Sequence, residues 1–243
     1  MSLPLYTTPH LAAGFLIVSN FQHRHKMWPR NAPKLSGSTR RTVELLTRDQ
    51  CNCYWDKMRK GKVTSTKVGP VCRKKAWNRV RNEILDPPDL SYIPYVARGL
   101  KDEEKGVQVL LSALRCQGNQ AQAYPIGLVL HSEHDWLAAS PDRLLKVNDE
   151  WCLAEVKNWY VTEKQKHISN LKYIDKHGKL KRTHNHYYQV QTALLVSGMK
   201  KCYFVVHGTE SSIEVIEFDN AYCTTILEKT RQFYDEMLQP LGW

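Results

Sequence analysis

The sequence lacks an apolar run long enough to cross a bilayer. The longest, Leu11 to Val18, has eight residues, and no basic segment precedes it. We therefore expect neither a membrane-spanning helix nor a secretory signal, and no membrane partner. No internal repeat or low-complexity tract is visible. An intracellular protein is expected, and the basic clusters do not distinguish nucleus from cytoplasm.

Paired metal-binding motifs are also missing. The seven cysteines are an odd number in a chain without an export signal, which favours reduced thiols. Cys51-x-Cys53 and His184-x-His186 have neither the C-x-x-C nor the H-x-x-x-H spacing that is typical of structural zinc sites. We therefore do not expect zinc.

Acidic residues are scarce in two parts of the chain. Between Gln22 and Arg81 there are 17 Lys or Arg against three acids, and between Lys157 and Arg182 there are eight against two. The formal net charge is +11, so the rest of the chain is net acidic. Two basic blocks on an acidic remainder indicate a polyanionic partner such as nucleic acid. A solvated basic face explains the charge alone equally well.

Composition and periodicity predict one folded domain. Apolar residues make up 42% of the chain and charged residues 24%, which are globular values. Prolines interrupt residues 1–42, which we interpret as an N-terminal arm with one short element near Leu11 to Ser19. Residues 43–243 form the single domain. The predicted helices cover 43–60, 71–85, 102–114, 187–196 and 224–238. The predicted strands cover 126–131, 136–139, 144–147, 151–156, 201–207 and 212–218. This order predicts an α/β fold with a small mixed β-sheet flanked by helices.

Three charged residues accompany the hairpin predicted over 144–156. Glu155 and Lys157 are two apart on a strand, so their side chains leave the same face. Asp142 precedes the partner strand, and the hairpin can bring its carboxylate beside Glu155. Two converging carboxylates suit a hard cation, and a neighbouring lysine can stabilise charge on a phosphate. The simpler interpretation is a Glu155–Lys157 ion pair on an edge strand.

Five short motifs follow one another along residues 50–240. They are Trp55-x-x-x-Arg59-x-Gly61-x-Val63-Thr64-x-Thr66, Gly99-x-x-x-Glu103-x-x-Gly106, Leu137-Ala-Ala-Ser-Pro-Asp142, Leu153-Ala-Glu155-Val-Lys157 and Tyr187-Tyr-Gln189-Val-Gln191. This succession resembles the lambda-exonuclease or YqaJ-type viral recombinase family of PD-(D/E)XK nucleases. Three positions depart from the family pattern, because Gly106 replaces an Ala, Thr66 a Ser and Arg143 the Gly that commonly follows Pro-Asp.

The resemblance implies a restriction-endonuclease-like core and a role for each matched residue. The implied metal ligands are Asp142, Glu155, the backbone carbonyl of Val156, and Glu103. The other implied catalytic residues are Lys157, Gln189 and Gln191. The implied 5′-phosphate pocket consists of Arg59, Thr64, Thr66 and Ser140. A guanidinium fork with hydroxyl donors suits a phosphate. The basic residues expected to contact the DNA backbone are Arg143, Lys62, Lys179 and Lys181.

The implied activity is that of a Mg²⁺-dependent exonuclease, with Mn²⁺ as a substitute. It would remove mononucleotides 5′ to 3′ from linear double-stranded DNA, in recombination or genome processing. A single-strand-annealing recombination partner and a homo-oligomer stay open. An endonuclease or ribonuclease on the same scaffold would not need the phosphate pocket around Arg59. A non-catalytic nucleic-acid-binding module would not need buried acids.

Overall fold

The computed structural model describes residues 37–50, 53–88, 94–162 and 167–243. One compact unit runs from Leu35 to Trp243. The short element expected near Leu11 to Ser19 lies outside the described residues. The first described helix begins at Ser38, within the range 1–42 that we expected to be an arm.

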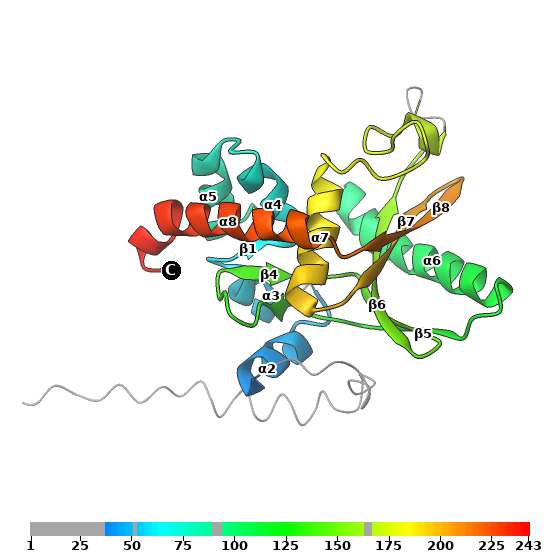
Figure 1. Ribbon diagram of the computed structural model, residues 1–243, viewed down its shortest axis with the longest axis horizontal. Coiled ribbons are helices and arrows are strands. Elements are labelled where there is room, and N and C mark those ends of the chain that lie inside the picture. The colour runs from blue at the N-terminus through cyan, green and yellow to red at the C-terminus, as the bar shows by residue number, and fades with distance from the viewer. Residues whose placement is uncertain (1–36, 51–52, 89–93, 163–166) are drawn as a thin grey trace, which may run out of the picture. The chain divides into compact units, whose positions relative to one another are not determined.

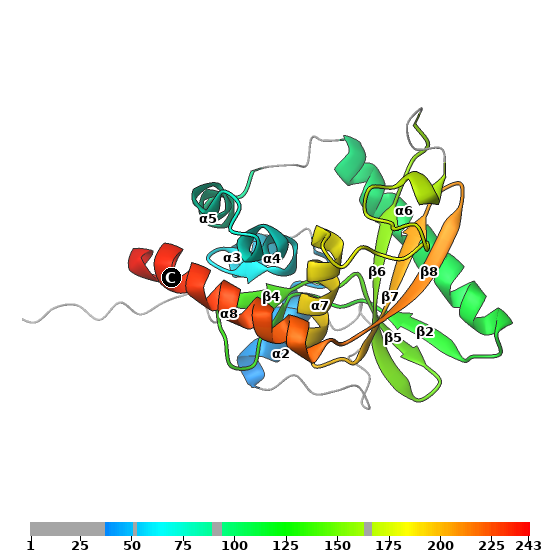
Figure 2. The same cartoon turned by 45° about the horizontal axis from the view of Figure 1, so that its top comes forward.

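Helices predominate in the first part of the described chain, and strands follow one another after the long helix that ends at Cys116 (Figures 1 and 2). The described helices are α2 (Ser38–Leu46), α3 (Cys53–Arg59), α4 (Ser65–Cys72), α5 (Trp77–Leu85), α6 (Pro94–Cys116), α7 (Asn185–Ser197) and α8 (Asn220–Met237). The strands are β1 (Val63–Thr64), β2 (Ala121–Tyr124), β3 (Val129–Leu130), β4 (Leu137–Ala139), β5 (Arg143–Val147), β6 (Glu150–Asn158), β7 (Lys201–His207) and β8 (Ser211–Glu217). This is the predicted α/β class, with helices flanking small mixed sheets. In these described ranges, no helix has the length and apolar character needed to cross a bilayer.

The larger sheet has the strand order β2-β5-β6-β7-β8, and the smaller one β1-β4-β3. β6 pairs antiparallel with β5 and parallel with β7, so it is the central strand of a mixed sheet. The predicted hairpin is confirmed, and Asn148 in its turn has a φ of 51°, a left-handed conformation that asparagine tolerates. The edge-strand location of a Glu155–Lys157 ion pair is therefore wrong, because β6 has a neighbour on each side.

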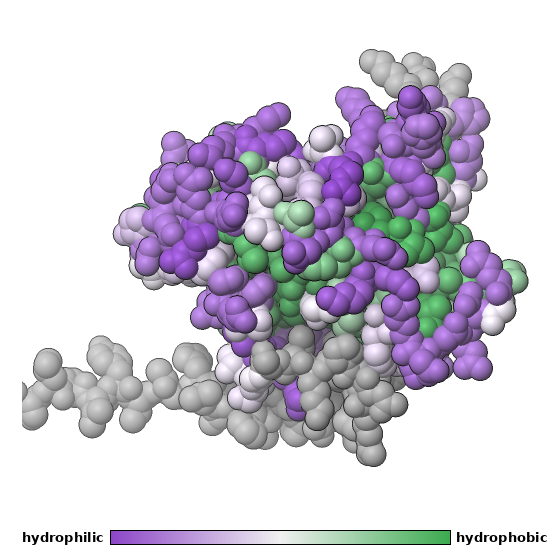
Figure 3. All heavy atoms as spheres, in the orientation of Figure 1, coloured by the Kyte–Doolittle hydropathy of each residue, from purple (hydrophilic) through white to green (hydrophobic). Residues whose placement is uncertain are grey.

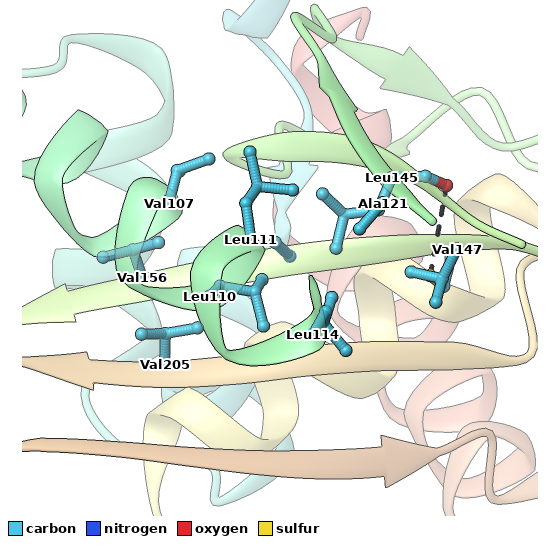
Figure 4. Packing of buried hydrophobic residues seen from close by; sticks show 11 residues of the cluster. Val107, Leu110, Leu111, Leu114, Ala121, Leu145, Val147, Val156 and Val205 are labelled. Carbon is cyan, nitrogen blue, oxygen red and sulfur yellow. Dashed lines mark hydrogen bonds between the residues drawn. The ribbon is translucent and has the colours of Figure 1, made fainter. Parts of the chain in front are cut away.

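The core between α6 and the larger sheet follows from helical and strand periodicity. α6 directs a stripe of apolar side chains onto the sheet, and alternate residues of β6 face it (Figure 4). The buried cluster consists of Val107, Leu110, Leu111, Leu114, Ala121, Leu145, Val147, Cys152, Ala154, Val156 and Val205. The intervening residues of β6, including Glu155 and Lys157, leave the opposite face. α6 thus covers one face of the hairpin, and the other carries Glu155 and Lys157 beside the buried side chains of Leu144 and Leu153.

The helix predicted over 43–60 is wrong as a single element, because the chain forms α2 and α3 instead. Gln50, between them, has a φ of 50°. The hydroxyl of Thr47 accepts the N–H of Leu128 at 2.7 Å, and the amide of Gln50 donates to the carbonyl of Pro141 at 2.9 Å. These contacts with distant parts of the chain replace the next helical turn.

Other helices and strands also begin or end at residues different from those predicted. The helix predicted over 71–85 is replaced by α4 and α5, and Lys74 and Ala76 between them have φ values of 50° and 48°. The strand predicted over 126–131 contains only β3. β2 was not predicted, because four residues give too short a pattern, but it pairs with β5 along its whole length. The strand predicted over 201–207 is confirmed with its ends as β7, and the remaining predicted elements are present with shifted ends.

Close packing at Gly106 fixes the distance of α6 from β6. A Cβ atom at Gly106 would lie 2.5 Å from Cγ1 of Val156. We expect Gly106→Val to lower the free energy of unfolding by about 1–3 kcal/mol, because overpacking pushes the helix off the sheet. Urea denaturation followed by circular dichroism measures this. Ser112→Val adds the same side chain to an exposed position of α6, with an expected change below about 0.5 kcal/mol. Equal losses in the two variants would contradict the close contact.

Candidate active site

The start of β5 brings Asp142 beside the centre of β6. The Asp142 carboxylate accepts the N–H of Val156 at 2.6 Å, in the register set by the hairpin. The Lys157 ammonium donates to Glu155 at 2.5 Å. Glu155 is only 2% exposed. The three residues that the sequence placed on this hairpin therefore lie together on the face opposite α6.

Burial and mutual repulsion disturb the ionisation of these acids. Burial raises the pKa of Asp142 above its ordinary value, although Lys157 opposes the shift. Burial, and then the charge of Asp142, raise the pKa of Glu155 to about 8. Burial alone would lower the pKa of Lys157, but the carboxylates of Glu155 and Asp142 raise it above its ordinary value. One lysine thus faces two buried acids, an excess of negative charge that favours binding of a further cation.

Glu103 approaches this site from α6 and is already paired. The Arg143 guanidinium donates to Glu103 at 2.6 Å and to Glu104 at 2.9 Å. Burial, followed by the charge of Asp142, raises the pKa of Glu103 to about 7. Arg143 was expected to contact the DNA backbone, whereas its guanidinium here contacts the acids of α6.

Two glutamines of α7 have different roles. The amide of Gln189 donates to Glu155 at 2.5 Å, so α7 helps to hold this carboxylate in place. The amide of Gln191 donates to the carbonyl of Glu217 at 2.8 Å and accepts the N–H of Asp219 at 2.9 Å. Gln191 therefore connects α7 to the start of α8, and these contacts do not join it to the acids.

The residues of the expected phosphate pocket form two groups. Arg59 and Ser140 both contact Trp55, and Thr64 contacts Thr66. The Arg59 guanidinium lies 3.8 Å from the ring centre of Trp55, whose indole N–H donates to the Ser140 hydroxyl at 3.3 Å. The hydroxyls of Thr64 and Thr66 are 3.3 Å apart. β1, which ends at Thr64, pairs with β4, which leads to Ser140. Burial lowers the pKa of Arg59 to about 10, which still leaves the guanidinium charged at neutral pH.

The lysines expected at the DNA backbone differ in their contacts. The ammonium of Lys62 donates to the carbonyl of Asp135 at 3.0 Å, and that of Lys181 donates to the carbonyl of Lys172 at 2.8 Å. The side chain of Lys179 is exposed. The structure thus places Lys62 and Lys181 against main-chain carbonyls.

Three residues near the site were not assigned roles from the sequence. The rings of Tyr173 and His186 meet edge to face at 4.9 Å. Burial, and then the charge of Lys157, lower the pKa of His186 to about 3, so the imidazole is neutral. Trp55 stands four residues before Arg59, a spacing that places both on one helix face. The spacing could therefore have identified Trp55 as a neighbour of Arg59. The loop around Tyr173 has no periodic pattern from which its position could have been predicted.

The donor set suits a divalent cation. Asp142 and Glu155 offer buried carboxylates, which hard cations prefer. In the described part of the chain, no group of three or more His, Cys, Asp or Glu is arranged to hold a metal ion, and Glu103 is engaged by Arg143. The carboxylates of Asp142 and Glu155 are therefore the two acidic donors that the described residues bring together beside Lys157, and a ligand role for the carbonyl of Val156 stays a prediction.

A comparison with protein families identifies the family of this chain. Residues 54–200 match the model of the YqaJ-like viral recombinase domain. The chain belongs to this family. The match spans more than half of the sequence and contains all five motifs, and it supports the predicted nuclease class. No curated protein matches the chain.

Solved structures share the fold. An alkaline exonuclease (LHK-Exo) from Laribacter hongkongensis is 24% identical, with a TM-score of 0.59, covering 75% of this chain and 91% of that one. A SOX–DNA complex is 12% identical, with a TM-score of 0.55, covering 80% and 69%. A KSHV SOX–RNA complex is 13% identical, with a TM-score of 0.51, covering 80% and 72%. These likenesses confirm the PD-(D/E)XK core that the sequence predicted.

The raised pKa of Glu155 makes the stability of the metal-free protein depend on pH. An unfolded glutamate has a pKa of about 4.3, whereas Glu155 in the fold has one of about 8. The folded state therefore binds this proton more tightly, and stability falls as the pH rises through that interval. We expect Glu155 to contribute a loss of at most about 1.4 kcal/mol per pH unit. Urea denaturation in EDTA at a series of pH values measures it. Glu155→Gln should show a shallower slope, and equal slopes would contradict the shift.

Proposed function

We propose that this protein is a divalent-metal-dependent exonuclease that degrades linear duplex DNA from 5′-phosphorylated ends and releases 5′-mononucleotides. The observation that carries the proposal is the cluster of buried Glu155 with half-buried Asp142 and Lys157 on the central hairpin. Withdrawing two acids and a lysine from water, even in part, is costly, and a protein that only bound nucleic acid would gain nothing from it.

Each residue of the cluster has a definite task in phosphodiester hydrolysis. A bound Mg²⁺ ion, or Mn²⁺ in its place, would polarise the scissile phosphate and stabilise the leaving oxygen. Asp142 and Glu155 would hold the ion, and Gln189 keeps the Glu155 carboxylate oriented through its hydrogen bond. The fixed ammonium of Lys157 would position the attacking water and stabilise the developing negative charge.

Polarity is inferred from the expected pocket around Arg59. A guanidinium stacked on Trp55, whose indole also contacts the Ser140 hydroxyl, suits a terminal phosphate. The paired hydroxyls of Thr64 and Thr66 stand on and just after β1, which pairs with the strand that leads to Ser140. Proteins of the same fold support a nucleic-acid substrate. LHK-Exo is an alkaline exonuclease and has been solved with dAMP. SOX has been solved with DNA and with RNA.

Basic side chains near α3 and α5 would hold the duplex without reading its sequence. Lys57, Lys60, Lys74, Lys75 and Arg79 are exposed. Figure 3 shows hydrophilic side chains gathered over α5 and α8. Contacts of lysine and arginine with phosphates are independent of sequence and weaken as salt increases.

A gel time course on linear duplex DNA with Mg²⁺ tests the proposal. The substrates carry a 5′-phosphate or a 5′-hydroxyl and a label at either terminus, and they are compared with a closed circle and an RNA duplex. We expect progressive loss from the phosphorylated 5′ end and no cutting of the circle. Cutting of the circle or of the RNA would instead indicate an endonuclease or a ribonuclease on the same metal site. Binding of DNA without cleavage of any substrate would contradict the enzymatic proposal.

Removing either partner of the buried ion pair should separate binding from cleavage. We expect Lys157→Ala and Glu155→Gln to lower the cleavage rate by about 10²-fold or more, since each removes a charge at the reacting phosphate. Duplex binding in Ca²⁺, measured by fluorescence anisotropy, should stay near that of the wild type. Lys105→Ala, on the exposed surface of α6, is the control. Turnover near the wild-type rate in either site variant would refute the site assignment.

The pocket around Arg59 should matter only for phosphorylated ends. We expect Arg59→Ala to slow digestion of 5′-phosphorylated duplexes by about 10-fold or more, the loss of one charge-assisted contact to phosphate. Digestion of 5′-hydroxyl ends should hardly change. Lys57→Ala removes an exposed charge from the same helix and should affect both ends alike. Equal slowing on both ends by Arg59→Ala would exclude a terminal phosphate pocket.

A further inference from the structure

Arg143 and Asp142 are neighbours in sequence but serve opposite faces of the hairpin. Side chains alternate along a strand, and Arg143 is paired in register with Ala154, a residue of the core beneath α6. Its guanidinium therefore reaches α6, where it contacts Glu103 and Glu104. Asp142 turns the other way, toward the N–H of Val156.

The guanidinium occupies the position that a cation on Glu103 would need. One of its nitrogens lies 2.6 Å from the Glu103 carboxylate and 2.6 Å from the main-chain carbonyl of Asp142. A second nitrogen lies 2.9 Å from Glu104. Three acceptors on two elements thus converge on one positive group, with 22% of its side chain exposed. A divalent ion on the same carboxylate would be strongly repelled by a guanidinium this near.

The net charge of the side chains around Glu103 and Glu155 also favours a single divalent ion. Four acids contribute to the cluster, and they are Asp142, Glu155, Glu103 and Glu104. Two permanent cations, Lys157 and Arg143, face them. When all are ionised, two negative charges are left over, which one divalent ion neutralises. A second such ion would leave the cluster with excess positive charge.

We propose that the Arg143 guanidinium takes the place of a second divalent cation at Glu103, so that the metal centre of this protein holds a single ion on Asp142 and Glu155. The inference rests on the proposed metal-dependent function. It makes Arg143 a positioning residue, which ties the main chain at Asp142 to α6.

The surroundings of Arg143 leave room for an ion if the guanidinium is removed. A pocket of about 550 Å³ adjoins the Glu103–Arg143 pair and is also lined by Glu104 and Gln108. Water and ions can therefore reach Glu103 from this side. Truncating Arg143 would expose an acid that is already near Asp142, and would create a new cation site from residues that are present.

Titration of the full-length protein with Mn²⁺ alone tests the proposal. Isothermal calorimetry and the electron paramagnetic resonance signal of free Mn²⁺ give the number of ions bound per chain. We expect one ion for the wild type and two for Arg143→Gly. Arg143→Gln, which keeps most of the side-chain volume, should also bind two and guards against a folding defect in the glycine variant. Adding Glu103→Gln to Arg143→Gly should restore a single ion.

Lys105→Ala is the matched control, because it removes one positive charge that pairs with Asp102 at 2.7 Å on the same helix. It should still bind one ion. Two ions on the wild type, or one ion on both Arg143 variants, would overturn the inference while leaving a metal-dependent enzyme in place. Failure of every protein to bind Mn²⁺ would refute the metal centre of the proposed function, and the inference with it.

Discussion

The hydrogen bond from the Val156 N–H to the Asp142 carboxylate connects the chemistry of this site to the register of one hairpin. It exists because β5 and β6 pair antiparallel across a short turn at Asn148. The same register places Glu155 and Lys157 on the face shared with Asp142 and sends the alternate residues of β6 into the core beneath α6. Core packing and site geometry are therefore fixed by a single pairing, and neither can shift without the other.

Charge compensation is the second condition that this arrangement meets. Buried acids are tolerated when they are paired and hydrogen-bonded, and each acid here has such a partner. Glu155 has Lys157 and Gln189, Asp142 has a main-chain N–H, and Glu103 has Arg143. The compensation is incomplete, as the raised pKa values of the acids show. This remaining imbalance is the electrostatic basis for binding a divalent ion.

The sequence predicted the hairpin and its acids because a strand has a period of two and Pro141 marks its start. It also predicted the helix that became α6 from a clear apolar stripe. It did not predict where helices break, because Gln50 leaves the helix for partners far along the chain. Nor did it predict the contact of Arg143 with α6 or the hydrogen bonds of Gln191 with Glu217 and Asp219. Such side-chain contacts depend on the packing of separate elements, which motif spacing does not encode.

The catalytic acids and the proposed phosphate pocket lie on strands that differ in how many backbone hydrogen bonds hold them in place. Glu155 lies on β6, which is hydrogen-bonded on both sides. Thr64 lies on β1, a strand of two residues with one neighbour. Local openings of a folded protein start where few backbone hydrogen bonds must break. Warming or mild denaturant should therefore loosen the proposed 5′-phosphate pocket while the acids at the centre of the sheet keep their positions. If the pocket selects DNA ends, this selectivity would be lost at temperatures where the acids are still in place.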